Sequence, residues 1–433
     1  MTAVPASAQI TTLFTGQAGL PTSQVPGAPG QVFNDSATSR TVFDRPYVSP
    51  DGTFVGFKGD LEASPFFDDA IVVFPLANPS AGVSFVESTP VPGAGGSGLL
   101  SNAFDRRVSV RNDGAFAFVT NSRVNGGLPS QGDNLVTYDP TTMSFTTALA
   151  PGSSFGGETI AADTSIGSPY ISSTGGIGAQ VVLDTTGEAV VFESTVFASE
   201  GQQPTGAPAP TSVFASQTTY FSNDGQGYLT QAVSFPPSNT IETTVLDGNT
   251  VINGGATLPG SSFLSPVSDT SPADNGAGMN EAGVWWARGS NQDGTEWAVV
   301  DGALVAVEGD SAFGTSETWV EINGVAADSL GNYIVMGETS TDDDVLVYNG
   351  SLLLARSGDA IDLPGYALRD GGLFDFEPND IALSDTGTAI FVARLTQNGS
   401  NAGAALLSVA IPEPTTGLAL AGTAGLLLRR RRS

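Results

Sequence analysis

The side chains that this sequence offers for chemistry are carboxylates, tyrosines, arginines and a single lysine, Lys58. The chain has 433 residues and contains neither histidine nor cysteine. A Ser-His-Asp triad, a histidine general base, a thiol nucleophile and the usual zinc and iron sites are therefore excluded. Any catalysis would have to use acids, phenols or the few basic residues.

Paired carboxylates are the catalytic arrangement that these residue types still allow, because glycoside hydrolysis needs only two well-placed acids. The chain carries 44 Asp and Glu residues, but no motif selects two of them. An enzyme therefore stays the alternative hypothesis, and we predict no catalytic residue.

Two acidic runs, Asp342-Asp343-Asp344 and Asp68-Asp69, could supply oxygen ligands for Ca²⁺. Neither has the spaced acids of a calcium-binding loop, so solvated turns are the favoured interpretation. A metal site stays open, and Ca²⁺ is the one cofactor that the sequence suggests.

The four tryptophans lie in one part of the chain, at Trp285, Trp286, Trp297 and Trp319. Exposed aromatic side chains bind sugars, whereas buried ones fill contacts between packed sheets. Core packing is the favoured interpretation, with Trp285 and Trp286 on opposite faces of one strand.

The charge of the chain limits its partners. The formal net charge is −29, from 44 acidic and 15 basic residues. Such a surface repels phosphate backbones, so we exclude nucleic acid as a partner. It also avoids an anionic membrane surface, except at the C-terminal arginine run.

A short turn pattern recurs seven times and indicates which elements position these residues. Each copy has a small or polar residue, two variable residues and a glycine, and the copies are on average about 56 residues apart. Asn, Asp or Ser shortly before Gly is turn chemistry, and the apolar residues that follow, as in Tyr333–Val335, predict a strand. The third copy is assigned to Asp184–Gly187. The seven turn glycines are Gly52, Gly114, Gly187, Gly225, Gly283, Gly331 and Gly387.

Tight hairpins complete the repeating unit. Asp247-Gly248, Asp301-Gly302 and Asn349-Gly350 each separate two apolar segments, which is typical of two-residue hairpin turns. With the strands on either side of the glycine turn, each unit holds about four strands.

Seven four-stranded units predict an all-β fold, a seven-bladed β-propeller over residues 9–410. The first unit lacks its first strand, and an extra strand, Ala404–Ala410, follows the last unit. We expect Ile10–Phe14 to pair with Leu406–Ala410, because this closes the ring and removes two exposed edges. An open β-solenoid or tandem β-sandwiches are the alternatives.

The C-terminal segment, residues 411–433, has three ordered features: Pro412-Glu413-Pro414, an apolar run over Leu418–Leu428, and four arginines. An apolar helix over Thr415–Leu428 rises about 21 Å, which is too short to span a membrane unaided. Its contact with the membrane is therefore expected to be transient, with the positive end on the cytoplasmic side. The residues that carry the pattern are Pro412, Glu413, Pro414, Arg429, Arg430, Arg431 and Arg432.

This segment closely resembles the PEP-CTERM sorting signal of Gram-negative bacteria. The resemblance implies a short C-terminal sorting helix, processing by an exosortase-type enzyme at the inner membrane, and a final location at the cell surface or outside the cell. Exopolysaccharide is then an expected partner. The glycine turns also resemble a tandem NxxGxxAF-type repeat of proteins with this tail, on Asn280 and Ala117-Phe118. That resemblance implies no enzymatic activity.

Export by this route requires an N-terminal signal. Residues 1–8 are expected to be the end of a signal peptide or a disordered start, since Ala6-Ser7-Ala8 has the small-x-small form of a cleavage site. We expect the rest of the signal to be encoded upstream of Met1. The functional hypothesis is an exported cell-surface or extracellular-matrix protein with a non-catalytic structural or adhesive role. An exported carbohydrate-active enzyme that uses paired carboxylates is the alternative.

Overall fold

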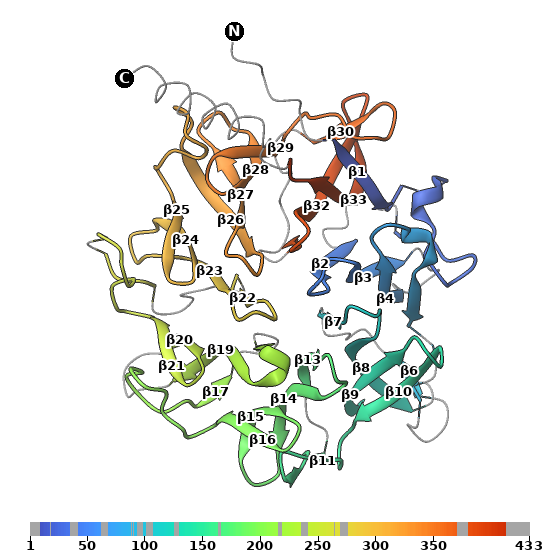
Figure 1. The fold of residues 1–433 in the computed structure, drawn as a ribbon, viewed down its shortest axis with the longest axis vertical. Helices are drawn as coiled ribbons and strands as arrows, with labels where there is room; N and C mark the ends of the chain where they lie inside the picture. Colours follow the sequence, from blue (N-terminus) through green and yellow to red (C-terminus); the bar gives the residue numbers. More distant parts are fainter. Residues whose placement is uncertain are drawn as a thin grey trace, which may run out of the picture.

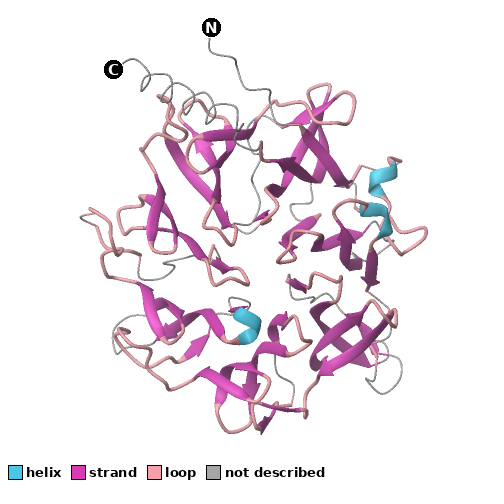
Figure 2. Ribbon diagram, viewed as in Figure 1, coloured by secondary structure: helices cyan, strands magenta, loops and turns pink. Residues whose placement is uncertain are grey.

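The computed structural model describes residues 9–17, 19–34, 42–61, 68–87, 89, 91–92, 98–100, 107–124, 130–162, 166–214, 219–234, 241–263, 265–268, 276–369 and 380–412. Regular structure within these residues is β-strand, apart from three short 3₁₀ turns (Figure 2). These turns are η1 (Pro21–Ser23), η2 (Pro79–Ala81) and η3 (Asn223–Gly225). No helix in the described ranges is long and apolar enough to cross a membrane.

The strands form seven antiparallel blades around a central axis, so the predicted seven-bladed β-propeller is confirmed (Figure 1). Blade 1 contains β2 (Phe43–Val48), β3 (Phe54–Leu61), β4 (Asp68–Pro75) and β5 (Val83–Val86). Blade 2 contains β6 (Gly98–Leu100), β7 (Val108–Val110), β8 (Phe116–Val124), β9 (Ser130–Asp139) and β10 (Ser144–Leu149). Blade 3 contains β13 (Gly167–Ile171), β14 (Ile177–Leu183), β15 (Gly187–Phe192) and β16 (Thr195–Ser199), and the hairpin β11 (Ser154–Phe155) and β12 (Glu158–Thr159) precedes it.

The remaining blades follow the same order from the axis outward. Blade 4 contains β17 (Val213–Phe214), β18 (Tyr220–Ser222), β19 (Gly227–Ser234), β20 (Ile241–Leu246) and β21 (Asn249–Asn253). Blade 5 contains β22 (Gly278–Met279), β23 (Trp285–Ser290), β24 (Glu296–Val300) and β25 (Ala303–Val307). Blade 6 contains β26 (Trp319–Ala327), β27 (Tyr333–Thr339), β28 (Asp344–Tyr348) and β29 (Leu352–Arg356). Blade 7 contains β30 (Tyr366–Leu368), β31 (Ile381–Leu383), β32 (Thr388–Gln397), β33 (Ser400–Ala410) and the N-terminal β1 (Ile10–Thr15).

The ring closes through β1 and β33, as predicted. Ile10 lies opposite Val409, and the antiparallel register runs to the pair Thr15 and Ala405. Phe14 on β1 then reaches blade 1, where its ring is 5.0 Å from that of Phe74 in an edge-to-face arrangement. The two chain ends therefore share one blade, which excludes the open solenoid and the tandem sandwiches.

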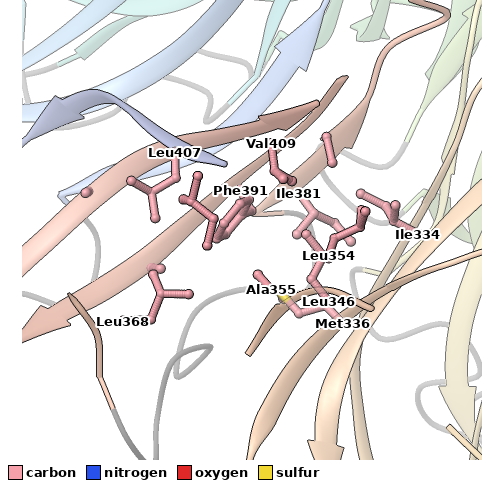
Figure 3. Packing of buried hydrophobic residues seen from close by; sticks show 14 of the residues in the cluster. Ile334, Met336, Leu346, Leu354, Ala355, Leu368, Ile381, Phe391, Leu407 and Val409 are labelled. Carbon is pink, nitrogen blue, oxygen red and sulfur yellow. The ribbon is translucent and has the colours of Figure 1, made fainter. Parts of the chain in front are cut away.

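The core is divided among the contacts between neighbouring blades, because each blade is apolar on both faces. In the described part of the chain the buried apolar residues form seven clusters, one for each pair of adjacent blades. Figure 3 shows the cluster between blades 6 and 7, in which Met336 and Leu346 face Phe391 and Leu407. Burial of this kind is the main stabilising term of the fold.

We call the turn that follows the innermost strand of each blade (β2, β7, β13, β18, β22, β26 or β31) the inner turn, and it is the repeated turn that the sequence reveals. Its glycine has a positive φ in every blade, between 73° and 90°, a conformation that favours Gly. The inner turns are Ser49–Gly52, Arg111–Gly114, Ser172–Gly175, Ser222–Gly225, Asn280–Gly283, Asp328–Gly331 and Ser384–Gly387.

Gly187 is the exception, and the assignment of the third repeat needs correction. Asp184–Gly187 connects β14 to β15, one turn farther along the blade, and Gly175 occupies the inner turn of blade 3. Both turns require a positive φ at Gly and are followed by apolar strands, so the local chemistry alone does not separate them.

The predicted two-residue hairpins are confirmed at the outer edge of blades 4, 5 and 6. Asp247, Asp301 and Asn349 all adopt positive φ, at 48°, 48° and 46°, followed by a glycine of positive φ as a type I′ turn requires. Each side chain also accepts a hydrogen bond from the first residues of the second strand, as from Tyr333 N to Asn349 Oδ1 at 2.9 Å. In blade 3 Glu193 takes this role with Ile177 N at 2.7 Å.

Most of the C-terminal signal lies outside the described residues, and so does the segment 1–8. Ile411 N donates to the oxygen of Gly387 at 2.8 Å, directly before Pro412. Glu413, Pro414, Arg429, Arg430, Arg431, Arg432 and the expected sorting helix are outside the described ranges.

Candidate binding site at the mouth of the central channel

Side chains at the second or third positions of the inner turns accept hydrogen bonds from a neighbouring turn, between blades 1 and 2, 3 and 4, 4 and 5, and 6 and 7. Asn112 Oδ1 accepts from Asp51 N of the preceding turn at 2.9 Å. Asp224 Oδ1 accepts from Ser173 N at 2.8 Å, and Asp385 Oδ1 accepts from Ser329 N at 2.7 Å. These contacts explain why the repeat has Asn, Asp or Glu in its turns, and we call the connected set the inner-turn ring.

Two cavities that share lining residues lie in the central channel beside the inner-turn ring. The first has a volume of about 370 Å³ and the second about 380 Å³. Tyr47, Pro50 and Glu281 line both. A cavity of this size is in the range that holds a small ligand.

The first cavity has two unlike halves, one lined by residues of blades 1, 2 and 4 and the other by residues of blades 5 to 7. The first group supplies arginine and tyrosine side chains, and the second supplies mostly apolar ones. The polar half contains Arg45, Tyr47, Arg107 and Tyr220. The half that we call apolar contains Met279, Trp286, Ala326, Ala327, Ile381 and Leu383, together with the polar residues Asn280, Glu281, Ser329 and Asp385.

Arg107 is held in a fixed orientation in the polar half. Its guanidinium lies over the ring of Tyr220, 3.7 Å from the centroid, and Nη1 donates to the carbonyl oxygen of Thr219. The residue is only 9% exposed. A cation–π contact of this kind strengthens when water is excluded.

A bulge in the inner strand turns Tyr47 toward the channel. Arg45 has a φ of 46° and its backbone N donates to Asp380 Oδ1 at 3.0 Å, and the strand register shifts between Asp44 and Tyr47. Positive φ is costly for a residue with a long side chain, so the bulge is a strained feature at the channel.

Blade 3 repeats this bulge. Ser168 has a φ of 54°, Pro169 follows it as Pro46 follows Arg45, and the register shifts before Tyr170. The two bulges therefore place a tyrosine at equivalent positions of blades 1 and 3.

Tyr170 and Glu281 form a hydrogen-bonded pair in the second cavity. The Tyr170 hydroxyl donates to both carboxylate oxygens of Glu281, at 2.9 and 2.8 Å, and Asp224 N donates to Oε1 at 2.5 Å. Burial raises the pKa of Glu281, while these hydrogen bonds act in the opposite direction. Burial and then the charge of Glu281 raise the pKa of Tyr170, so the phenol stays protonated and acts as a donor.

The other acids at the mouth are also engaged by neighbouring turns. A hydrogen bond from Ser173 lowers the pKa of Asp224. The two oxygens of Asp385 accept from Ser329 N at 2.7 Å and from Ser329 Oγ at 2.5 Å. Glu281, Asp224 and Asp385 thus hold neighbouring inner turns together, and Glu281 and Asp385 also line the first cavity with Arg45 and Arg107.

The acidic runs that sequence suggested as cation ligands do not converge. Asp343 pairs with Arg356 Nη1 at 2.7 Å, and Asp344 is buried at the start of β28. Asp69 pairs with Lys58 at 3.0 Å. Among the residues that the structure describes, no group of three or more acids is arranged to hold a metal ion.

The tryptophans divide between core and cavity. Trp285, Trp297 and Trp319 are buried between blades, as predicted. Trp286 is half-buried and lines the first cavity, on the opposite face of β23 from Trp285.

Sequence reasoning missed the arginines and tyrosines of the channel. A signal was present, because Arg45-Pro46-Tyr47 and Ser168-Pro169-Tyr170 repeat the same Pro-Tyr dipeptide shortly before an inner turn. Arg107 and Tyr220 carry no such signal.

No protein-family model and no curated protein matches this sequence. Among solved structures, the β-propeller domain of the Trilobed protease from Pyrococcus furiosus is similar, at 10% identity and a TM-score of 0.42, over 86% of this chain and 94% of that one. The polysaccharide lyase Uly1 is similar at 9% identity and a TM-score of 0.41, over 93% and 97% of the two chains. The Trypanosoma rangeli sialidase follows at 9% identity and 0.31, over 90% of this chain and 60% of that one. At these values the similarities carry no functional argument.

Proposed function

We propose that this protein is an exported cell-surface or extracellular-matrix component with a non-catalytic, adhesive role, and that it binds glycans at the mouth of its central channel. One observation carries the proposal. The acids that line the two cavities, Glu281, Asp224, Asp113 and Asp385, all accept hydrogen bonds from residues of the inner turns. Because these carboxylates already accept structural hydrogen bonds, they are better suited to maintaining a binding surface than to transferring protons to and from a substrate.

The lining of the first cavity suits a sugar. Trp286 is half-buried and lines the cavity, so its ring can contact the C–H groups of a sugar. Asn280 and Ser329 add polar groups at the rim. Small-ligand sites are usually mostly apolar with a few placed polar groups, which is the composition of this cavity.

The test is a glycan array with the purified full chain, followed by a hydrolysis assay on each glycan that binds. Ala282 lines the first cavity and is exposed, so Ala282→Trp should block the mouth and abolish binding. Leu330 has the same position in the inner turn of blade 6, is 80% exposed and lines neither cavity, so Leu330→Trp is the matched control. Binding that survives Ala282→Trp, or turnover of a bound glycan, would refute the proposal.

Export and processing belong to the same proposal and rest on the C-terminal pattern. We expect an exosortase-type enzyme to act near Pro412-Glu413-Pro414, with transient contact between the apolar run and the inner membrane. Mass spectrometry of surface material from the native host should find protein without the arginine run. Surface protein that still ends in Ser433 would count against this proposal.

A carbohydrate-active enzyme is the second candidate, and one observation favours it. Glu281 and Asp385 line the same cavity, and burial raises the pKa of Glu281, as a general acid requires. If this candidate is right, the full chain hydrolyses a polysaccharide and Glu281→Gln removes the activity while leaving binding intact.

A further inference from the structure

We propose that the two cavities together bind an uncharged oligosaccharide of at least two sugar units, and that the Tyr47 hydroxyl hydrogen-bonds to it where it passes from one cavity into the other. This inference rests on the proposed glycan binding. It adds the length and the charge of the ligand, together with a residue that selects for length.

The two cavities adjoin each other at Tyr47. Tyr47, Pro50 and Glu281 line both of them, and Tyr47 also lines a third, small cavity of about 20 Å³. Of the described residues, it is the only one that lines all three. Each of the two larger cavities has the volume of a small-ligand site. A single sugar would therefore leave one of them empty, whereas a disaccharide can place one unit in each.

The linings of the two cavities suit two neighbouring sugar units. Trp286 gives the first cavity an aromatic side chain that can contact sugar C–H groups. The second cavity is lined by polar side chains instead, among them Asn112, Ser173 and Asn223. In the described part of the chain, neither the Ser173 hydroxyl nor the Asn223 side-chain amide makes a hydrogen bond, so both groups can bind sugar hydroxyls.

The charges of the two linings favour an uncharged ligand. The first cavity has equal numbers of arginines and acids, which are Arg45, Arg107, Glu281 and Asp385. In the second cavity Arg111 donates to Asp113 at 2.8 Å. Asp224 and Glu281 are two further acids there. An anionic glycan would therefore meet unbalanced negative charge in the second cavity, in a protein whose net charge is −29.

Blade 3 provides an internal comparison for Tyr47. Tyr170 has the equivalent position after the same bulge, and its hydroxyl donates to both carboxylate oxygens of Glu281. The Tyr47 hydroxyl, in contrast, makes no hydrogen bond with any residue that the structure describes. Burial, followed by the charge of Glu281, raises the pKa of Tyr47, so the phenol stays protonated. A protonated phenol without a protein partner, placed where the cavities adjoin, can donate to the ligand.

The experiment is a calorimetric titration of the purified full chain with homo-oligosaccharides of one to four units. Glucose, N-acetylglucosamine, galactose and mannose provide uncharged series, and galacturonate provides an acidic one. We expect an uncharged series to bind, with a Kd that falls at least about tenfold from one unit to two, as a few added hydrogen bonds produce. The galacturonate series should bind more weakly than this uncharged series at every length.

Two variants test the two parts of the proposal. Tyr47→Phe removes only the hydroxyl and should weaken disaccharide binding about three- to tenfold, with little effect on the monosaccharide. Ser173 is exposed and lines only the second cavity, so Ser173→Trp should remove the gain in affinity from the second sugar. Tyr366→Phe and Leu330→Trp are the matched controls, because neither position lines a cavity, and both should keep the wild-type affinities.

Thermal unfolding of each variant shows that it is folded, and the variants are compared only in the folded state. Equal affinity for the monosaccharide and the tetrasaccharide, or tightest binding of the galacturonate series, would overturn this inference and leave glycan binding standing. A folded Tyr47→Phe protein with the wild-type affinity for the disaccharide would overturn the role of the hydroxyl. If none of these series binds, the inference is wrong, and if the glycan array is also blank, the proposed function is wrong as well.

Discussion

At the scale of single residues, glycine is required where the inner turns reverse the chain. Gly331 has a φ of 78° with open space around the position of a Cβ, whereas a Cβ on Gly225 would lie 2.4 Å from ring atoms of Phe192. The two positions therefore separate the cost of backbone strain from the cost of a clash.

We expect Gly331→Ala to lower the free energy of unfolding by about 1–2 kcal/mol, the cost of a left-handed residue with a Cβ. Gly225→Ala should cost clearly more, because the Phe192 ring must also move. Chemical denaturation of the three proteins measures both values. If the two variants lost the same free energy of unfolding, the close approach of Phe192 to position 225 would not contribute to the cost.

A second residue-scale prediction concerns pH. Asp60 and Asp69 lie directly opposite each other on β3 and β4, and Lys58 pairs with Asp69. Burial, followed by the charge of Asp69, raises the pKa of Asp60 to about 7, whereas an unfolded Asp has a pKa of about 3.9. The contribution of Asp60 to stability is therefore fully present below about pH 4 and is lost as the pH rises to about 7.

The measurement compares urea unfolding of the wild type and Asp60→Asn at pH 5 and pH 8. The variant should gain stability relative to the wild type as the pH rises, because it has no proton to lose. A difference between the two proteins that does not change with pH would contradict the assignment of this pKa.

At the scale of elements, hydrogen bonds between inner turns join neighbouring blades. Asp385 of blade 7 accepts two hydrogen bonds from Ser329 of blade 6. A double-mutant cycle of Asp385→Ala and Ser329→Ala should therefore give a coupling energy of at least about 0.5 kcal/mol. The same cycle between Asp385→Ala and Ser80→Ala, in a separate exposed turn, should be additive within about 0.5 kcal/mol.

The strands and turns could be predicted from the sequence because their signals are local. An Asp-Gly pair between apolar segments, such as Asp301-Gly302, predicts a tight turn. Ile10–Phe14 could likewise be matched to the extra strand near the C-terminal end of the propeller. The prediction for the third inner turn is wrong because Ser172–Gly175 and Asp184–Gly187 have the same turn chemistry. The cavity could not be predicted, because Arg45, Arg107 and Tyr220 meet only through the closure of the ring.

At the scale of the whole molecule, the pairing of β1 with β33 makes one closed ring of the chain. Thr11 lies opposite Ser408, and the natural chain has no cysteine. Thr11→Cys with Ser408→Cys should therefore form a disulfide under oxidising conditions and raise the melting temperature, since it fixes the two chain ends. Thr11→Cys with Ser80→Cys is the control and should stay reduced. If the variant with Thr11→Cys and Ser408→Cys stayed reduced under oxidising conditions, this result would contradict the closed ring.

The central claim is that the mouth of the channel, beside the inner-turn ring, binds a glycan without converting it. Hydrogen–deuterium exchange of the full chain, with and without the tightest glycan from the array, tests it most directly. We predict slower exchange at Asn280–Gly283, Asp328–Gly331 and β2, no change at the outer strands β5 and β25, and recovery of the glycan intact. Protection confined to the outer strands, or a glycan recovered in cleaved form, would contradict the account.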